Sequence, residues 1–113
     1  MNIVNMSHAL STDAKERLEE MVGEAVEETV IHVQIDMDAP MRPQLDALIK
    51  AHEGALWGMD LFIPPALSYA AAYVTARLSS AQSDAMLPVP PSMVVLRREG
   101  TPPQFMPAEI LRG

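Results

Sequence analysis

Apolar and polar residues follow two different spacings along the chain, and these spacings predict where strands and helices lie. Residues 2–6 form a short apolar run that predicts a strand, and residues 7–11 form a polar turn. From Thr12 to about Gly23, apolar residues recur at helical spacing, and Ser11 or Thr12 is placed to cap the helix. The chain therefore opens with a strand, a loop and a helix, which is half of a βαβ unit.

The middle of the chain repeats this alternation. The β-branched residues of 29–35 predict a second strand with His32 at its centre, where we expect a structural role. Pro43 suits the first turn of a short second helix that ends near His52 or Gly54. The buried stripe of this helix is predicted to consist of Leu45, Leu48 and Ile49.

A third strand and a third helix follow. Residues 57–63 contain the strand, which is best defined over residues 60–63, and Pro64 and Pro65 stop it. A helix is expected to begin at once after the two prolines. The residues of this helix predicted to face the core are Leu67, Ala71, Val74 and Leu78.

The C-terminal third contains a loop and two strands. Residues 79–91 are rich in serine and proline and predict a loop. The continuous apolar run over residues 93–96 is typical of a strand covered on both faces, and residues 104–111 predict a last strand that returns as an antiparallel hairpin. Pro107 favours an edge position for that last strand, because proline has no N–H group to donate to a strand ladder.

The predicted fold class is α/β, with the element order β-α-β-α-β-α-β-β in a single domain spanning residues 1–113. The right-handed crossover rule predicts a mainly parallel sheet with helices on both faces and a C-terminal β-hairpin. Ligands of such sheets bind beyond the carboxyl ends of the strands. We expect three segments to meet there, namely residues 7–11, residues 64–68 and the region of Arg97.

Composition narrows the class of protein. Of 113 residues, 49% are hydrophobic but only 4% are aromatic, so a small and largely aliphatic core is expected. The chain has no cysteine, which excludes disulfides and thiolate metal sites. No apolar run approaches the length of a membrane span, and the first residues do not resemble a secretory signal. We expect a cytoplasmic protein with no membrane partner.

The formal net charge of −7 argues against binding to long nucleic acid, because such binding depends on clustered lysine and arginine. Much of the acidic charge lies on the first predicted helix, where a solvated face is expected. A small anion can still be held locally by backbone N–H groups together with one or two arginines.

Motifs for cofactor or metal chemistry are sparse. The glycine-rich nucleotide motifs and the zinc-hydrolase motif do not occur, so no cofactor is predicted. Asp36 and Asp38 are two carboxylates without a further ligand at suitable spacing, and such a pair is more typical of a turn than of a metal site. We predict no metal.

Several short segments, none of them specific alone, have a characteristic order and spacing. They are Asn5-Met6-Ser7-His8-Ala9-Leu10-Ser11, Val33-Gln34-Ile35-Asp36, Phe62-Ile63-Pro64-Pro65-Ala66-Leu67-Ser68, Val95-Leu96-Arg97, Thr101-Pro102-Pro103-Gln104-Phe105 and Ala108-Glu109-Ile110. In this order, and over nearly the full length, the chain resembles a family of small CRISPR-associated accessory proteins of type III systems, the Csx group designated fifteen. The family typically has proline at the position of Ala9.

The resemblance implies a minimal CRISPR-associated Rossmann-like (CARF-like) domain that binds cyclic oligoadenylate, most simply cyclic tetra-adenylate, a second messenger of antiviral defence. Phosphates are then expected on backbone N–H groups of residues 7–11 and 65–68, with Arg97 or Arg42 in support, and adenines against Met6 and Gln34. A two-fold homodimer, or a larger homo-oligomer, would match the symmetry of the ring. The expected ligand-binding residues are Met6, Ser7, His8, Ala9, Ser11, Gln34, Arg42, Pro64, Pro65, Ala66, Ser68 and Arg97.

Three functions remain open from the sequence. The first is a binding protein that lowers the free messenger concentration by sequestration. The second is a metal-independent ring nuclease, with His8 as acid or base and Ser7 stabilising phosphate charge. The third is a structural interaction module without a ligand. The scarcity of catalytic side chains favours sequestration, and His8 is expected to contact the ligand.

Overall fold

The structure, a computed structural model, describes residues 1–81 and 91–112. Its strands are β1 (Asn2–Asn5), β2 (Glu27–Val30), β3 (Leu61–Ile63), β4 (Met93–Glu99) and β5 (Gln104–Leu111). Its helices are α1 (Thr12–Val22), α2 (Met41–Ala51), α3 (Glu53–Trp57) and α4 (Ser68–Ala81). Within these residues no helix combines the length and apolar character needed to cross a bilayer.

The described strands form one five-stranded sheet in the order β2-β1-β3-β4-β5. The pairs β1–β2, β1–β3 and β3–β4 are parallel, and β5 pairs antiparallel with β4. The fold is therefore α/β with a mixed, mostly parallel sheet, and the predicted C-terminal hairpin is confirmed. In this order β2 lies on one side of β1 and β3 lies on the other. The direction in which successive strands are added to the sheet therefore reverses between β1 and β3.

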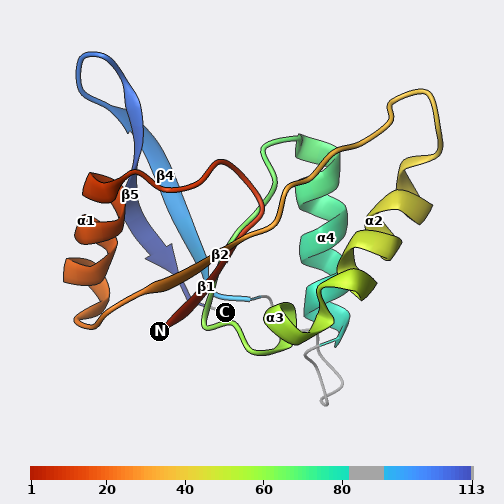
Figure 1. The fold of residues 1–113 in the computed structure, drawn as a ribbon, viewed down its shortest axis with the longest axis horizontal. Coiled ribbons are helices and arrows are strands. Elements are labelled where there is room, and N and C mark those ends of the chain that lie inside the picture. Colours follow the sequence, from red (N-terminus) through yellow and green to blue (C-terminus); the bar gives the residue numbers. More distant parts are fainter. Residues whose placement is uncertain (82–90, 113) are drawn as a thin grey trace.

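Helices cover both faces of the sheet, with α1 on one side and α2, α3 and α4 on the other (Figure 1). Ile3 and Ile63 belong to an apolar cluster that includes Leu18 of α1. Val4 and Phe62 belong to a second cluster, on the side of α2 to α4. Alternate residues of the short central strands therefore pack into two cores, one on each face of the sheet. This explains why the sequences of these strands are continuously apolar.

The bounds of α1 agree with the prediction because both ends carry local signals. The Ser11 hydroxyl accepts a hydrogen bond from the Ala14 N–H at 3.1 Å and caps the helix. Gly23 adopts a left-handed conformation, with φ of 77°, and its N–H donates to the Glu19 carbonyl.

The second strand is shorter than the predicted span of residues 29–35 and lies closer to the N-terminus. The Ile31 N–H still donates to the Asn5 carbonyl at 2.8 Å, but β1 ends at Asn5 and the chain turns away. Residues 32–35 are consequently outside β2, since β1 no longer runs beside them. His32 is exposed beyond the strand, so its predicted place at the strand centre is wrong.

Residues 53–57 form α3, which overlaps the predicted start of the third strand at residue 57. Leu56 is buried against the cluster that contains Phe62, whereas Trp57 is 57% exposed. A short apolar run does not distinguish a helical turn from a strand, and here the packing of Leu56 decides for the helix. The third strand is thereby reduced to β3.

The second and fourth helices differ in how well their core faces were predicted. In α2, Pro43 lies in the first turn and the predicted apolar stripe packs against the core. In α4, which starts at Ser68 rather than directly after the prolines, Leu67 is 39% exposed. Val74 and Leu78 are buried as predicted, whereas Ala70 is buried in place of the half-buried Ala71. Pro65 is buried just before the helix and takes the place in the core that was expected for Leu67. The buried residues of α4 are Ala70, Val74 and Leu78.

The predicted loop over residues 79–91 is wrong at its start, because α4 continues to Ala81. The Ser79 hydroxyl donates to the Thr75 carbonyl at 2.8 Å, as serine commonly does within a helix. The rest of this prediction falls on residues 82–90, which lie outside the described residues, and on Pro91, which is buried.

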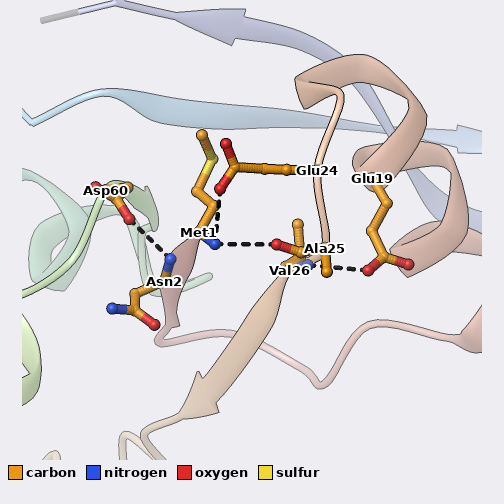
Figure 2. Close-up of polar contacts among 7 residues, drawn as sticks. All are labelled: Met1, Asn2, Glu19, Glu24, Ala25, Val26 and Asp60. Carbon is orange, nitrogen blue, oxygen red and sulfur yellow. Dashed lines mark hydrogen bonds and ion pairs between the residues drawn. The ribbon is translucent and has the colours of Figure 1, made fainter.

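At the amino-terminal ends of the strands, carboxylates bind backbone N–H groups (Figure 2). Asp60 Oδ2 accepts a hydrogen bond from the Asn2 N–H at 2.8 Å. Glu19 Oε2 accepts one from the Val26 N–H at 2.9 Å. Glu19 therefore fixes the start of β2, although the acidic residues of this region were expected to form only a solvated face.

The Met1 ammonium is bound at the same edge of the sheet (Figure 2). It donates to the Ala25 carbonyl at 2.9 Å and lies 3.0 Å from Glu24 Oε1. The hydrogen bond to the Glu24 carboxylate raises the pKa of the ammonium group above its ordinary value of 8.0. A second acidic residue from this region thus has a structural contact.

Candidate functional site

The candidate site lies beyond the carboxyl ends of β1 and β3, where the winding of the sheet reverses. Residues 7–11 connect β1 to α1, and residues 64–67 connect β3 to α4. We call these the β1 loop and the β3 loop. In open α/β sheets, ligands bind in the crevice that two such neighbouring loops form.

The β1 loop is held in place by Asn5, which is completely buried at the end of β1. Asn5 Oδ1 accepts a hydrogen bond from the Ser7 N–H at 2.8 Å, and Nδ2 donates to the His8 carbonyl at 2.8 Å. Asn5 Nδ2 also donates to Glu28 Oε2 at 2.8 Å, and the same carboxylate oxygen accepts from the Leu10 N–H at 3.0 Å. Two neighbouring strands therefore fix the loop conformation.

The predicted site did not include Asn5 or Glu28. For Asn5 a signal was present, since an asparagine two residues before a turn N–H is typical of an Asx-turn. For Glu28 there was none, because its carboxylate reaches the loop only through the parallel pairing of β2 with β1.

Two cavities open at these loops, and Ser7, His8 and Ala66 line both of them. The first cavity has a volume of about 520 Å³ and extends from the β1 loop to the β4–β5 hairpin, where Gln104 lines it. The second has a volume of about 450 Å³ and extends toward the chain after β2, where Gln34 lines it. The three common residues form a shared boundary between the cavities.

β5 runs beside α1 (Figure 1), and its first residues, Gln104 and Phe105, line the first cavity. Arg17 of α1 forms an ion pair with Glu99 at the end of β4. The Ser11 hydroxyl also donates a long hydrogen bond, 3.4 Å, to Gln104 Oε1. These contacts place the first residues of β5 opposite the β1 loop, and the first cavity lies between them.

Most of the predicted site residues come together at the two cavities. Leu96 and Phe105, which were not predicted as site residues, complete the wall of the first cavity. The predicted residues that line one or both cavities are Met6, Ser7, His8, Ala9, Ser11, Gln34, Pro64, Pro65 and Ala66.

Arg42, Ser68 and Arg97 do not line either cavity. Arg42 lies on α2, where its Nε is 3.8 Å from Asp46 Oδ2. Arg97 is 68% exposed, and its Nη2 is 4.0 Å from Glu109 Oε2. Ser68 is the exposed first residue of α4. The expected arginine support is therefore not supplied to the cavities within one chain.

His32 is a further residue of the second cavity that the sequence did not reveal. It was expected inside a strand, and only the early end of β2 brings it to the cavity. His8 and His32 are the titratable side chains found among the described residues that line either cavity. No carboxylate, lysine or arginine accompanies them in those linings.

Backbone N–H groups are the main polar donors at the shared boundary. In the described part of the chain, the N–H groups of His8, Ala9, Ala66 and Leu67 make no hydrogen bond. The N–H groups of Ala66 and Leu67 in the β3 loop lie just before the N-terminus of α4, where the helix dipole adds positive potential. The arrangement suits a neutral or anionic group that accepts several hydrogen bonds.

Among residues 1–81 and 91–112, no group of three or more His, Asp or Glu side chains gathers at one place. Asp36 Oδ1 accepts a hydrogen bond from the Asp38 N–H at 2.9 Å, which is the geometry of a turn.

Comparisons with known proteins add no constraint on the site. The chain matches no protein-family model, and neither a search of curated proteins nor a search of solved structures finds a match. The functional interpretation therefore rests on the sequence pattern and on the geometry of the two cavities.

Proposed function

We propose that the protein binds cyclic oligoadenylate, most simply cyclic tetra-adenylate, at the two cavities and lowers the free concentration of this messenger by sequestration. The observation that carries the proposal is the pair of cavities that share Ser7, His8 and Ala66 at the reversal of winding in the sheet. The resemblance of the sequence to CRISPR-associated accessory proteins supplies the ligand class. On this proposal the fold is a CARF-like domain of a type III system.

The shared boundary is the proposed position of a phosphate group. The unbonded N–H groups of His8, Ala9 and Ala66 and the hydroxyl of Ser7 can donate hydrogen bonds to its oxygens. Because no arginine or lysine is found among the described residues that line the two cavities, recognition relies on these neutral donors. The affinity should therefore depend only weakly on salt concentration, in contrast to binding by clustered cations.

The second cavity is the proposed position of one adenine. Met6 contributes an apolar contact, and the carboxamide of Gln34 offers both a donor and an acceptor to the base edge. A base in this cavity and a phosphate at the shared boundary belong to one nucleotide unit of the ring. One chain then binds part of the ring, and a two-fold homodimer would bind the remainder with the same residues.

A ring nuclease is the second candidate function, and the presence of His32 beside His8 in the second cavity favours it. In this reaction the ribose 2′-oxygen attacks the adjacent phosphorus, the bond from phosphorus to the 5′-oxygen breaks, and a 2′,3′-cyclic phosphate forms. One neutral imidazole would accept the 2′-hydroxyl proton, and one protonated imidazole would donate a proton to the leaving 5′-oxygen. No metal takes part in these steps.

The decisive measurement is incubation of the protein with radiolabelled cyclic tetra-adenylate, followed by separation of bound, intact and cleaved species. Sequestration predicts that the ligand is bound and recovered intact. His8→Ala keeps the backbone N–H but removes the imidazole from both cavity linings, and it should lower affinity by about five- to one hundred-fold, as expected for a lost polar contact of that side chain. Arg97→Ala is the control, because Arg97 lies outside the cavities. Sedimentation of the saturated complex should show a dimer or larger assembly.

Three results would change the proposal. Multiple turnover that is lost in His8→Ala or His32→Ala with affinity retained would establish the ring nuclease. A complex that stays monomeric at saturation would remove the two-fold arrangement. Absence of any binding would leave the structural interaction module as the function.

A further inference from the structure

We infer that the first cavity is a second base pocket, in which Gln104 selects adenine and Phe105 stacks on the ring. This inference rests on the proposed nucleotide-binding function and adds residues of the hairpin to the site. Its starting point is that the first cavity touches the proposed phosphate position through Ser7 and His8, on the side opposite to Gln34.

The walls of the first cavity suit a flat aromatic ligand. Ile63, Val94 and Leu96 line its sheet side with aliphatic surface, and Leu10 lines it from the β1 loop. The volume of about 520 Å³ lies in the range of about 300–1,000 Å³ that is usual for small-molecule sites. A cavity that is mostly apolar, with few polar groups, binds a base through its faces and orients it through its edge.

Phe105 provides the stacking surface. The chain has two phenylalanines, and Phe62 is fully buried in the core, whereas Phe105 is 55% exposed at the first cavity. Leaving a large aromatic side chain half exposed has no benefit for the core. Aromatic side chains beside a cavity are the usual partners of nucleobase faces in single-stranded recognition.

Gln104 provides the base-specific contact. Its Oε1 receives only the 3.4 Å hydrogen bond from the Ser11 hydroxyl, and in the described residues its Nε2 has no partner. Gln44 shows the opposite case, because its carboxamide is bonded to the backbone of Asp36 and Pro40 on both its oxygen and its nitrogen. Gln104 therefore retains a donor and an acceptor side by side for a ligand.

This donor and acceptor pair complements adenine. Adenine presents its N6 amino group as a donor next to the N7 acceptor, and a glutamine carboxamide bonds to both. Hypoxanthine replaces the amino group with an oxygen, so the Gln104 oxygen would face an acceptor and one hydrogen bond would be lost. The pocket should therefore prefer adenine.

The contacts between the hairpin and α1 hold Gln104 and Phe105 in position. The ion pair between Arg17 and Glu99 joins the helix to the end of β4, five residues before Gln104 along the sequence. A base that enters the first cavity replaces the long bond between Ser11 and Gln104 with shorter bonds. The hairpin is thus a specificity element for the site.

The test compares cyclic tetra-adenylate with cyclic tetra-inosinate in titrations of the wild type, Gln104→Leu and Phe105→Leu. Asn2→Leu is the control, because it also replaces a carboxamide with leucine at an exposed position that lines neither cavity. We expect the wild type to prefer the adenylate by about ten-fold or more. Gln104→Leu should lose about ten-fold in affinity for the adenylate and bind both rings equally. Phe105→Leu should weaken the binding of both rings alike, and Asn2→Leu should match the wild type.

A second measurement reads the stacking directly. In a Trp57→Phe background, Phe105→Trp places a single tryptophan at the first cavity, and cyclic tetra-adenylate should quench its fluorescence. If the wild type binds the adenylate but Gln104→Leu retains both its affinity and its preference, the inference is overturned and the proposed function stands. If the wild type binds neither ring, the proposed function itself fails.

Discussion

The parallel strands begin at one edge of the sheet, the amino edge, and end at the opposite one, the carboxyl edge. Similar polar groups lie at both edges, but their hydrogen bonding differs. At the amino edge, the N–H groups of Met1, Asn2 and Val26 are all bonded to acceptors of the same chain. At the carboxyl edge, the N–H groups of His8 and Ala66 are unbonded in the described part of the chain, and these two residues line both cavities. A bonded edge contributes to stability, and an edge with open donors can bind a ligand.

The positions of the carboxylates also differ between the two edges. Asp60, Glu19 and Glu24 bind backbone or terminal groups directly at the amino edge. At the carboxyl edge Glu28 binds Asn5 and Leu10 behind the β1 loop, so its negative charge supports the loop from within. Among residues 1–81 and 91–112, none that lines either cavity carries a carboxylate, so these linings add no negative charge that would repel an anionic ligand.

The largest effect should come from the buried carboxamide that supports the carboxyl edge. Asn5→Leu removes three hydrogen bonds and leaves the Ser7 N–H and the Glu28 carboxylate without that partner. We expect the free energy of unfolding in urea to fall by about 3 kcal/mol. Asn2→Leu is the matched control at the other end of β1, where the side chain is exposed. It should change the free energy of unfolding by less than about 0.5 kcal/mol. Equal losses in the two variants would contradict a special role for Asn5.

An intermediate effect is expected at the amino edge. Glu19→Ala removes the acceptor of the Val26 N–H, which lies at a residue that is only 3% exposed. The free energy of unfolding should fall by about 1–2 kcal/mol. Glu20→Ala changes the neighbouring exposed residue of α1 and should have an effect of less than about 0.5 kcal/mol. Binding of cyclic tetra-adenylate should be the same in both variants, and a weaker affinity in Glu19→Ala would contradict the separation of the two edges.

The smallest effect concerns pH. Since the pKa of the Met1 ammonium is raised in the folded state, its contribution to stability is fully present below about pH 8 and is lost as pH rises through the folded-state pKa. Urea unfolding of a chain with its free amino group at Met1 should show a small decline in stability across this window. Glu24→Gln should flatten the decline, because the Glu24 carboxylate is the main cause of the shift. Identical pH profiles in the two proteins would exclude this contact as the origin.

Local signals determined those parts of the fold that depend on a few neighbouring residues. Ser11 and Gly23 mark the ends of α1, and the apolar runs mark the central strands and the hairpin. The α/β class and the position of the ligand crevice follow from this order of elements. The polar turn after β1 was therefore predictable as part of the candidate site.

Tertiary structure decided where an element ends and which residues line the cavities, because these features depend on the elements packed beside it. The end of β2, and with it the exposure of His32, follows from where β1 stops offering a partner. The walls of the first cavity follow from the packing of β5 beside α1, which brings Gln104 to Ser11. Such placements are set by packing between residues distant in sequence. The sequence therefore specified the β1 loop, while the fold alone decided that Gln104 and Phe105 of the hairpin line the first cavity and that Arg97 of the same hairpin does not.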